Sequence, residues 1–205
     1  YLVGALVIGT ALPHLLKDMT GIFHWKSVLI VTSSLASLGG LLIFFLIPNG
    51  PYRKPGQPLN LSVFLKVFQN KKFRSASFGY FGHMWELYAF WAFVPVMLTT
   101  YSSRQVESTI NIPILSFLII GIGSIACVLS GHLSQSVGTK KTAIISLFLS
   151  ALCCIISPFS FMINDETIFV LFLMFWGMVV IADSPLFSTL VAINSPVVYR
   201  GTALT

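Results

Sequence analysis

Residues 112–130 read IPILSFLIIGIGSIACVLS, a stretch without a single charged side chain. A helix needs about 20 mainly apolar residues to cross the hydrocarbon core of a bilayer, so this stretch predicts a membrane-spanning helix. Five further apolar stretches flank it, at residues 1–16, 25–48, 75–100, 142–163 and 168–193. Together they predict an all-α fold, a polytopic bundle of membrane helices.

The composition excludes an ordinary water-soluble domain. Charged residues make up only 9% of the chain, hydrophobic residues make up 56%, and the mean hydropathy is +0.88. A soluble domain carries about 25% charged residues, so there are too few polar side chains here to cover a water-exposed surface. The net charge of +6 comes from Lys and Arg between the apolar stretches rather than on one folded face. We therefore expect a lipid bilayer as the surroundings and no nucleic-acid partner.

The basic residues are unequally divided between the two sides of the predicted bundle. One side carries nine of them: Arg53, Lys54, Lys66, Lys71, Lys72, Arg74, Lys140, Lys141 and Arg200. The other side carries three: Lys17, Lys26 and Arg104. Cytoplasmic loops are enriched in Lys and Arg, so the richer side is predicted to face the cytoplasm of a multi-pass protein in the plasma or inner membrane.

The long basic segment at residues 49–74 is predicted to be a cytoplasmic linker. Its apolar side chains recur at helical spacing, at Leu61, Phe64, Leu65 and Phe68. This spacing indicates a short amphipathic helix lying on the membrane surface, and a plain linker is the alternative.

The segment between the fourth and fifth apolar stretches reads GHLSQSVGTKK, at residues 131–141. It resembles the short loop motif of the major facilitator superfamily, G-x-L-[AS]-D-R-x-G-R-[RK]. The residues that match in place are Gly131, Leu133, Ser134, Gly138 and Lys140, and Lys141 adds a further basic residue. Gln135, Ser136 and Thr139 replace the family's Asp and two Arg, so the charged part of the motif is missing here.

The resemblance implies a piece of a twelve-span transporter built from two halves. Residues 1–48 resemble the last two spans of the N-terminal half, residues 49–74 the linker, and residues 75–205 spans seven to ten with the start of span eleven. Residues 79–88, GYFGHMWELY, look like the branch of the cyanate- and nitrate-type permeases, although the Gly-rich nitrate signature is not visible in residues 1–16. A transporter of this family would move a small solute by alternating access.

Glu86 and His83 interrupt the third apolar stretch near its middle. A charged residue at the bilayer centre costs roughly 2.5–3.5 kcal/mol on insertion scales, so acids at such positions usually have a function. The two residues are three apart and share a helical face, which predicts a site for proton coupling or substrate contact. The alternative is a buried, hydrogen-bonded pair that holds neighbouring helices together.

Asp183 interrupts the sixth apolar stretch, and Ser184 and Pro185 follow it; Asp183 and Ser184 are both candidates for substrate contact or proton coupling. We expect the sequence Asp-Ser-Pro to break the helix here. Discontinuous helices near the midplane expose backbone groups that can bind substrate or ions. The alternative is that the carboxylate caps the helix after the break. Four aromatic residues have polar tips that could reach the same substrate, or could simply pack: Tyr80, Trp85, Tyr88 and Trp176.

Catalytic and metal-binding motifs are missing from the sequence. It contains no H-E-x-x-H, G-x-S-x-G or phosphate-binding G-x-x-x-x-G-K-[ST] pattern, and Cys127, Cys153 and Cys154 lack metal-ligand spacing. We therefore expect no enzyme activity, metal or cofactor. The predicted function is secondary active transport of a small solute, coupled to protons. The alternatives are an uncoupled facilitator or channel, a transporter-derived sensor without net flux, and a membrane-embedded enzyme.

Overall fold

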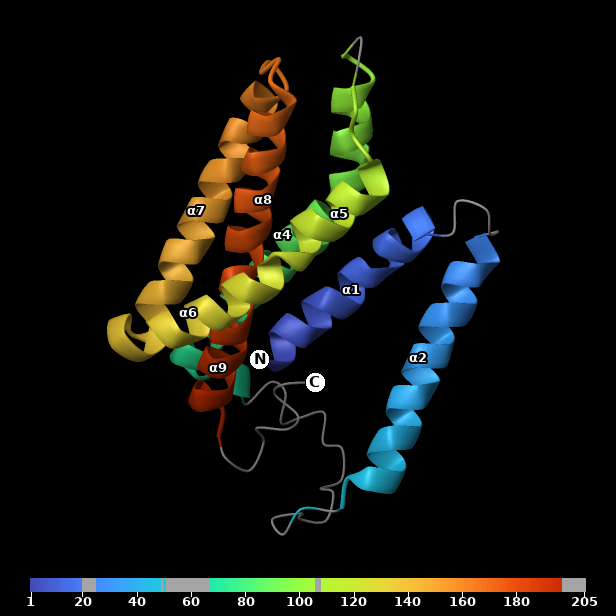
Figure 1. The fold of residues 1–205 in the computed structure, drawn as a ribbon. Helices are drawn as coiled ribbons and strands as arrows, with labels where there is room; N and C mark the ends of the chain where they lie inside the picture. Colours follow the sequence, from blue (N-terminus) through green and yellow to red (C-terminus); the bar gives the residue numbers. More distant parts are fainter. Residues whose placement is uncertain (20–24, 49, 51–66, 106–107, 197–205) are drawn as a thin grey trace.

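The computed structural model describes residues 1–19, 25–48, 50, 67–105 and 108–196, and Figure 1 shows its fold. Its helices are α1 (Leu2–Met19), α2 (Trp25–Leu46), α4 (Lys71–Ser102), α5 (Ile112–Gly121), α6 (Gly123–Val137), α7 (Thr139–Ser160), α8 (Glu166–Ala182) and α9 (Ser184–Asn194). No β-strand occurs in the described residues. The all-α helix bundle predicted from the apolar stretches is confirmed.

Five of the six predicted spans are long and apolar enough to cross a membrane. They are α1, α2, the pair α5–α6, α7 and the pair α8–α9. The remaining predicted span, the third apolar stretch, forms α4. It is not among them, because its centre holds His83 and Glu86 among Trp and Tyr side chains. At 1.5 Å per residue its 32 residues nevertheless extend about 48 Å, enough to cross the bilayer. It packs within the bundle against α5, α8 and α9.

The core lies where α4, α5 and α8 meet. Leu87 and Leu98 of α4, Ile119 of α5 and Leu173 of α8 are all at most 2% exposed and belong to one apolar cluster. Helix α1 crosses α5 and α6 and packs on both, whereas α2 stands apart on the far side of α1 in Figure 1 and buries none of its residues. The folded centre of the described chain is thus formed by α4 to α9 together with α1.

Polar side chains mark three of the helix starts. Asn111 accepts a hydrogen bond from the Ile114 amide, and Pro113 lies in the first turn of α5. Asn70 and Asp165 cap α4 and α8 in the same way. The caps satisfy backbone N–H groups that have no partner within the helix, which fixes where these helices begin.

Two of the spans are broken near their middles. α5 and α6 are separated at Ile122, a break that the apolar sequence did not reveal, and α8 and α9 are separated at Asp183. The predicted break at Asp183 is confirmed. Both breaks lie where helices pack very closely: a Cβ on Gly123 would come within 2.5 Å of the Ile181 side chain.

The segment 131–141 is not a loop of the length that the sequence suggested. Helix α6 continues through Val137 and α7 begins at Thr139, so only Gly138 separates them. Gly138 has φ +97°, a conformation that side-chain-bearing residues rarely adopt, and this explains a glycine at the sharp turn. Gly131 therefore lies within α6, while Lys140 and Lys141 are exposed in the first turn of α7.

Several expectations concern residues outside the described part of the chain. They include the amphipathic helix predicted around Leu61, Phe64 and Leu65, and the basic residue Arg200. Those expectations stay predictions.

Candidate functional site

The break between α8 and α9 places Asp183 against His83 of α4. The Nδ1 atom of His83 lies 2.9 Å from Oδ1 of Asp183, a distance typical of an ion pair. Both residues are 1% exposed. The contact meets the distance of an ion pair but not the full geometry of a hydrogen bond. Two residues exactly one hundred positions apart in sequence thus form one buried polar pair.

The pair is not fully satisfied by its protein surroundings. Among the described residues, Nε2 of His83 and Oδ2 of Asp183 have no hydrogen-bond partner, although both atoms are buried. Asp183 occupies the cap position of α9, yet its side chain makes no capping hydrogen bond. The capping role considered from the sequence is therefore not what the carboxylate does. Buried polar atoms without partners are rare, and those at this helix break are free to bind a proton, water or ligand.

Aromatic rings enclose the pair on one side. The ring of Tyr80 is stacked on that of His83, with centroids 6.2 Å apart and planes 9° apart, and Phe187 lies next to both rings. The Ser188 hydroxyl donates to the Tyr80 hydroxyl over 3.3 Å. These contacts come from α4 and α9, so the two helices hold the imidazole in a fixed orientation.

Glu86 faces a different neighbour from His83. Its Oε1 accepts a hydrogen bond from the Ser150 hydroxyl at 2.5 Å and another from the Cys154 thiol at 3.3 Å, both on α7. The sequence placed His83 and Glu86 together as one proton site. In the structure the two side chains make their direct contacts with different helices, because three residues along a helix rotate a side chain by about 60°: His83 contacts Asp183, and Glu86 contacts α7.

Ser150 is a site residue that sequence reasoning missed. Thr142, Ser146 and Ser150 recur at every fourth position of α7, and all three are buried. A stripe of small polar residues at this spacing indicates a helix face that packs against a polar neighbour. This signal was present in the sequence.

The remaining aromatic candidates fall into two groups. Trp176 of α8 is buried against Phe90 of α4, and its indole N–H has no hydrogen-bond partner among the described residues. Trp176 and Asp183 are seven residues apart, two helical turns along the same face. Trp85 and Tyr88 are 82% and 59% exposed and line an open groove of about 520 Å³ on the outer face of α4. The structure therefore brings Tyr80 and Trp176 to the buried side with the pair, and leaves Trp85 and Tyr88 outside it.

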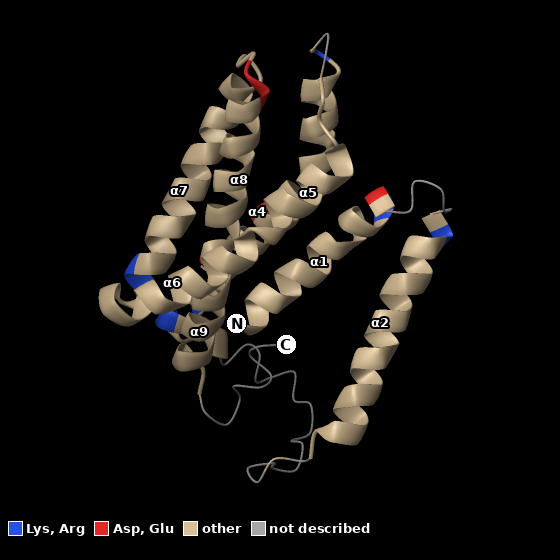
Figure 2. Ribbon diagram, in the orientation of Figure 1, with Lys and Arg blue, Asp and Glu red and all other residues tan. Residues whose placement is uncertain are grey.

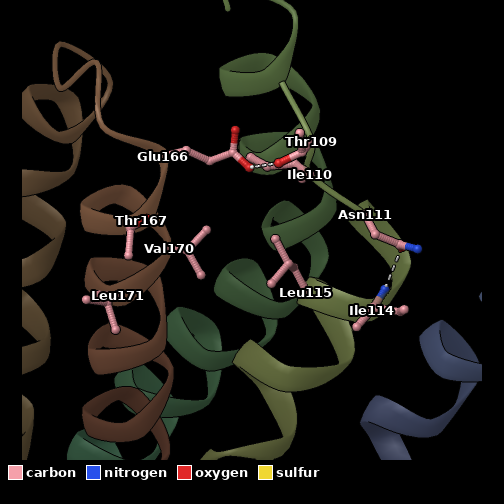
Figure 3. Close-up of a pocket in the computed structure, with 9 residues that line it drawn as sticks. All are labelled: Thr109, Ile110, Asn111, Ile114, Leu115, Glu166, Thr167, Val170 and Leu171. Carbon is pink, nitrogen blue, oxygen red and sulfur yellow. Dashed lines mark hydrogen bonds between the residues drawn. The ribbon is translucent and has the colours of Figure 1, made fainter. Parts of the chain in front are cut away.

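A cavity with polar and apolar walls lies at the opposite end of α8, and Figure 3 shows it. It is open, measures about 530 Å³ and lies between the starts of α5 and α8. Glu166 accepts hydrogen bonds of 3.3 Å from the hydroxyls of Ser108 and Thr109, and Asn111 donates to Asp18 of α1 over 2.7 Å. These bonds tie the α7–α8 end of the bundle to α5, and α5 to α1.

The described residues offer no metal centre. They contain no group of three or more His, Cys, Asp or Glu side chains arranged to hold a metal ion. The only close acid–base contact within them is the pair His83–Asp183. This buried acid–base pair at a helix break is the feature of the described residues on which a functional hypothesis can be built.

Comparison with known proteins agrees with the helix-bundle fold. The family model described as Major Facilitator Superfamily matches residues 1–205. Neither the comparison with curated proteins nor the comparison with solved structures gave a match. The family consists of multi-pass membrane transporters for small solutes, a class that is normally not enzymatic. The chain belongs to the Major Facilitator Superfamily.

Proposed function

We propose that this chain is the central part of a proton-coupled secondary transporter, and that His83 and Asp183 form its coupling site. The observation that carries the proposal is the buried ion pair at the α8–α9 break, with an unpartnered nitrogen and an unpartnered oxygen. Ionisable groups inside a membrane bundle are expensive, and they usually mark substrate or ion pathways. Discontinuous helices near the midplane are the usual carriers of such sites.

Proton binding at Asp183 changes the contact between α4 and the α8–α9 break. With the carboxylate charged, it attracts a protonated imidazole across 2.9 Å. A proton on the carboxylate removes that attraction, so the pair holds the two helices together in one protonation state and releases them in the other. Transport by alternating access needs a step of this kind, in which a bound ion shifts the balance between two arrangements of the helices.

The remaining parts of the proposal concern the whole transporter. Residues 1–48 would supply the last two spans of the first half, residues 49–74 the cytoplasmic linker, and residues 75–205 spans seven to ten and the start of span eleven. The end of the bundle with α7 and α9, where Lys140 and Lys141 lie, would face the cytoplasm of a plasma or inner membrane. The polar tips of Tyr80 and Trp176 would contact the solute.

Uptake into proteoliposomes tests the proposed function. The complete transporter would be reconstituted and screened for uptake of small organic and inorganic anions, with and without a pH gradient. We expect the gradient to drive accumulation above the outside concentration. Equilibration that ignores the gradient would instead support an uncoupled facilitator, and specific binding without flux would support a sensor.

Glu86→Gln is expected to leave gradient-driven accumulation within about twofold of the wild type. A glutamine Oε1 can still accept the hydrogen bonds from both Ser150 and Cys154, so α4 stays attached to α7, and exchanging a charged acceptor for a neutral one weakens them by only about 1 kcal/mol. The measurement is the ratio of inside to outside solute at steady state under a fixed pH gradient.

Glu86→Leu is the paired variant, because it removes both hydrogen-bond acceptors. We expect it to leave buried Ser150 without its acceptor and to lower the thermal stability of the purified protein. If Glu86→Gln transports but no longer responds to the gradient, the coupling site is Glu86 rather than Asp183.

A further inference from the structure

A basic cavity lies at the end of the bundle that carries the start of α4, and its lining does not include His83 or Asp183. It measures about 680 Å³ and lies between α4, α7 and α9. Lys71 and Lys72 line it from the first turn of α4, and Lys140 lines it from the first turn of α7. Figure 2 shows the blue Lys and Arg segments gathered at this end of α7 and near α9, while the red acidic segment of the α7–α8 turn lies at the other end.

The cavity has an unbalanced positive charge. None of its lining residues is Asp or Glu. Among the described residues, no carboxylate lies within 4 Å of the ammonium groups of Lys71, Lys72 or Lys140. Three lysines that line one cavity without an acid among its walls favour an anionic ligand, and phosphate oxygens are the usual partners of clustered lysines.

The rest of the cavity wall is apolar. Ile144 and Leu147 of α7 and Leu190 of α9 line it, and Phe187 forms part of the wall next to Gly79. Ile144 is 55% exposed, and Phe148 and Ile155 continue the exposed apolar face along α7. An apolar track thus begins at the lysines and runs along an exposed side of α7, a helix long and apolar enough to span a membrane. A water-soluble anion would gain nothing from this track, whereas an acyl chain would lie against it.

We propose that the cavity is a binding site for an anionic phospholipid. The phosphate lies between Lys71, Lys72 and Lys140, and an acyl chain follows Ile144 along α7. Basic pockets between membrane helices bind anionic headgroups in this manner, with each nearby Lys or Arg contributing to the attraction. The proposal does not depend on proton coupling, because the cavity shares no charged group with the coupling pair.

Lipid titration of the purified protein tests the proposal. The complete transporter, delipidated in a neutral detergent, would be titrated with phosphatidylglycerol, and bound lipid would be counted by native mass spectrometry. We expect each single Lys→Gln substitution to weaken binding about fivefold, and Lys71→Gln, Lys72→Gln and Lys140→Gln together to weaken it about 100-fold. Phosphatidylcholine, whose headgroup has no net charge, is expected to bind no better to the wild type than to the triple variant.

Lys141→Gln is the matched control. Lys141 is the neighbour of Lys140 and is exposed, but it does not line the cavity, so the substitution removes the same charge from the same end of the protein. We expect it to weaken phosphatidylglycerol binding by less than about twofold. Equal losses in Lys140→Gln and Lys141→Gln would mean that only the general charge of this end matters, and would overturn the proposed site.

Competition with glycerol 3-phosphate shows whether the cavity binds the phosphate of a phospholipid or that of a free solute. It carries the phosphate without the acyl chains, and we expect it not to compete with phosphatidylglycerol at equal concentration. Effective competition that is lost in the triple variant would show that the cavity binds a free phosphate-bearing solute, and would overturn the lipid assignment.

Discussion

Asp183→Asn is expected to abolish proton-driven accumulation while leaving solute exchange intact. Asn has nearly the shape of a protonated Asp, so it keeps the packing at the α8–α9 break but can neither lose a proton nor attract a charged His83. A driving force of 100 mV is worth about 2.3 kcal/mol per elementary charge, which gives about 50-fold accumulation when one proton accompanies each solute. We expect the wild type to approach this ratio and Asp183→Asn to reach a ratio of about one.

Two readouts separate coupling from folding in this experiment. Exchange of labelled for unlabelled solute without a gradient needs no net proton movement, so we expect Asp183→Asn to retain it within about tenfold. A merely structural role for Asp183 would reduce exchange and accumulation together. Gradient-driven accumulation that survives in Asp183→Asn would contradict the proposed coupling site.

Asp165→Asn is the matched control for this experiment. It makes the same chemical change at an exposed acid that caps α8, where it accepts hydrogen bonds from the amides of Thr167 and Ile168. Asn is as good a helix cap as Asp, so both the fold and the accumulation ratio should be unchanged.

Gly177→Ala is expected to destabilise the bundle more than any other glycine substitution within the described residues. A Cβ on Gly177 of α8 would lie 2.2 Å from the backbone oxygen of Ile119 on α5, and 3.3 Å from the carbonyl carbon. Backbone atoms cannot rotate away as a side chain can, so α5 and α8 would have to separate. Overpacking of a core usually costs about 1–3 kcal/mol, and we expect the upper end of this range or a failure to fold.

The expected result can be measured as the temperature at which the purified protein aggregates in detergent. Gly9→Ala is the control, because a Cβ there would meet no atom within 4 Å. Alanine is the better helix former by about 1 kcal/mol, so Gly9→Ala should be neutral or slightly stabilising. Equal stability of Gly177→Ala and Gly9→Ala would mean that α5 and α8 do not pack as closely as described.

Much of the fold could be predicted because the bilayer imposes it. Within lipid every backbone N–H and C=O must find a partner in the same segment, so a long apolar stretch has few alternatives to a helix. The break at Asp183 was also predictable, since a proline two residues later removes a backbone donor. The break at Ile122 was not predicted, although Gly121 and Gly123 flank it, because the packing of Gly123 against α8 exists only in the folded bundle.

The candidate site was predictable as a set of residues but not as a set of contacts. Glu86, His83 and Asp183 stand out in the sequence because a charge in lipid is costly wherever it points. Which acid faces the histidine depends on how α4 is rotated about its axis. The helical repeat shows which residues of α4 share a face, but it does not show which neighbouring helix that face contacts. The helices packed around α4 decide this, since α7 presents Ser150 to Glu86 while the α8–α9 break presents Asp183 to His83.

The sequence by itself determined that the chain lies in a lipid bilayer, that it is helical and where most of its spans lie, because these follow from local composition. It also indicated the family, through the spacing of a short motif. Tertiary structure alone decided that His83 pairs with Asp183, that Glu86 is bound to α7, and that three lysines meet at one cavity. These contacts join residues tens of positions apart, and their geometry depends on how whole helices pack. Packing is a sum over many weak contacts, so no short stretch of the sequence encodes it.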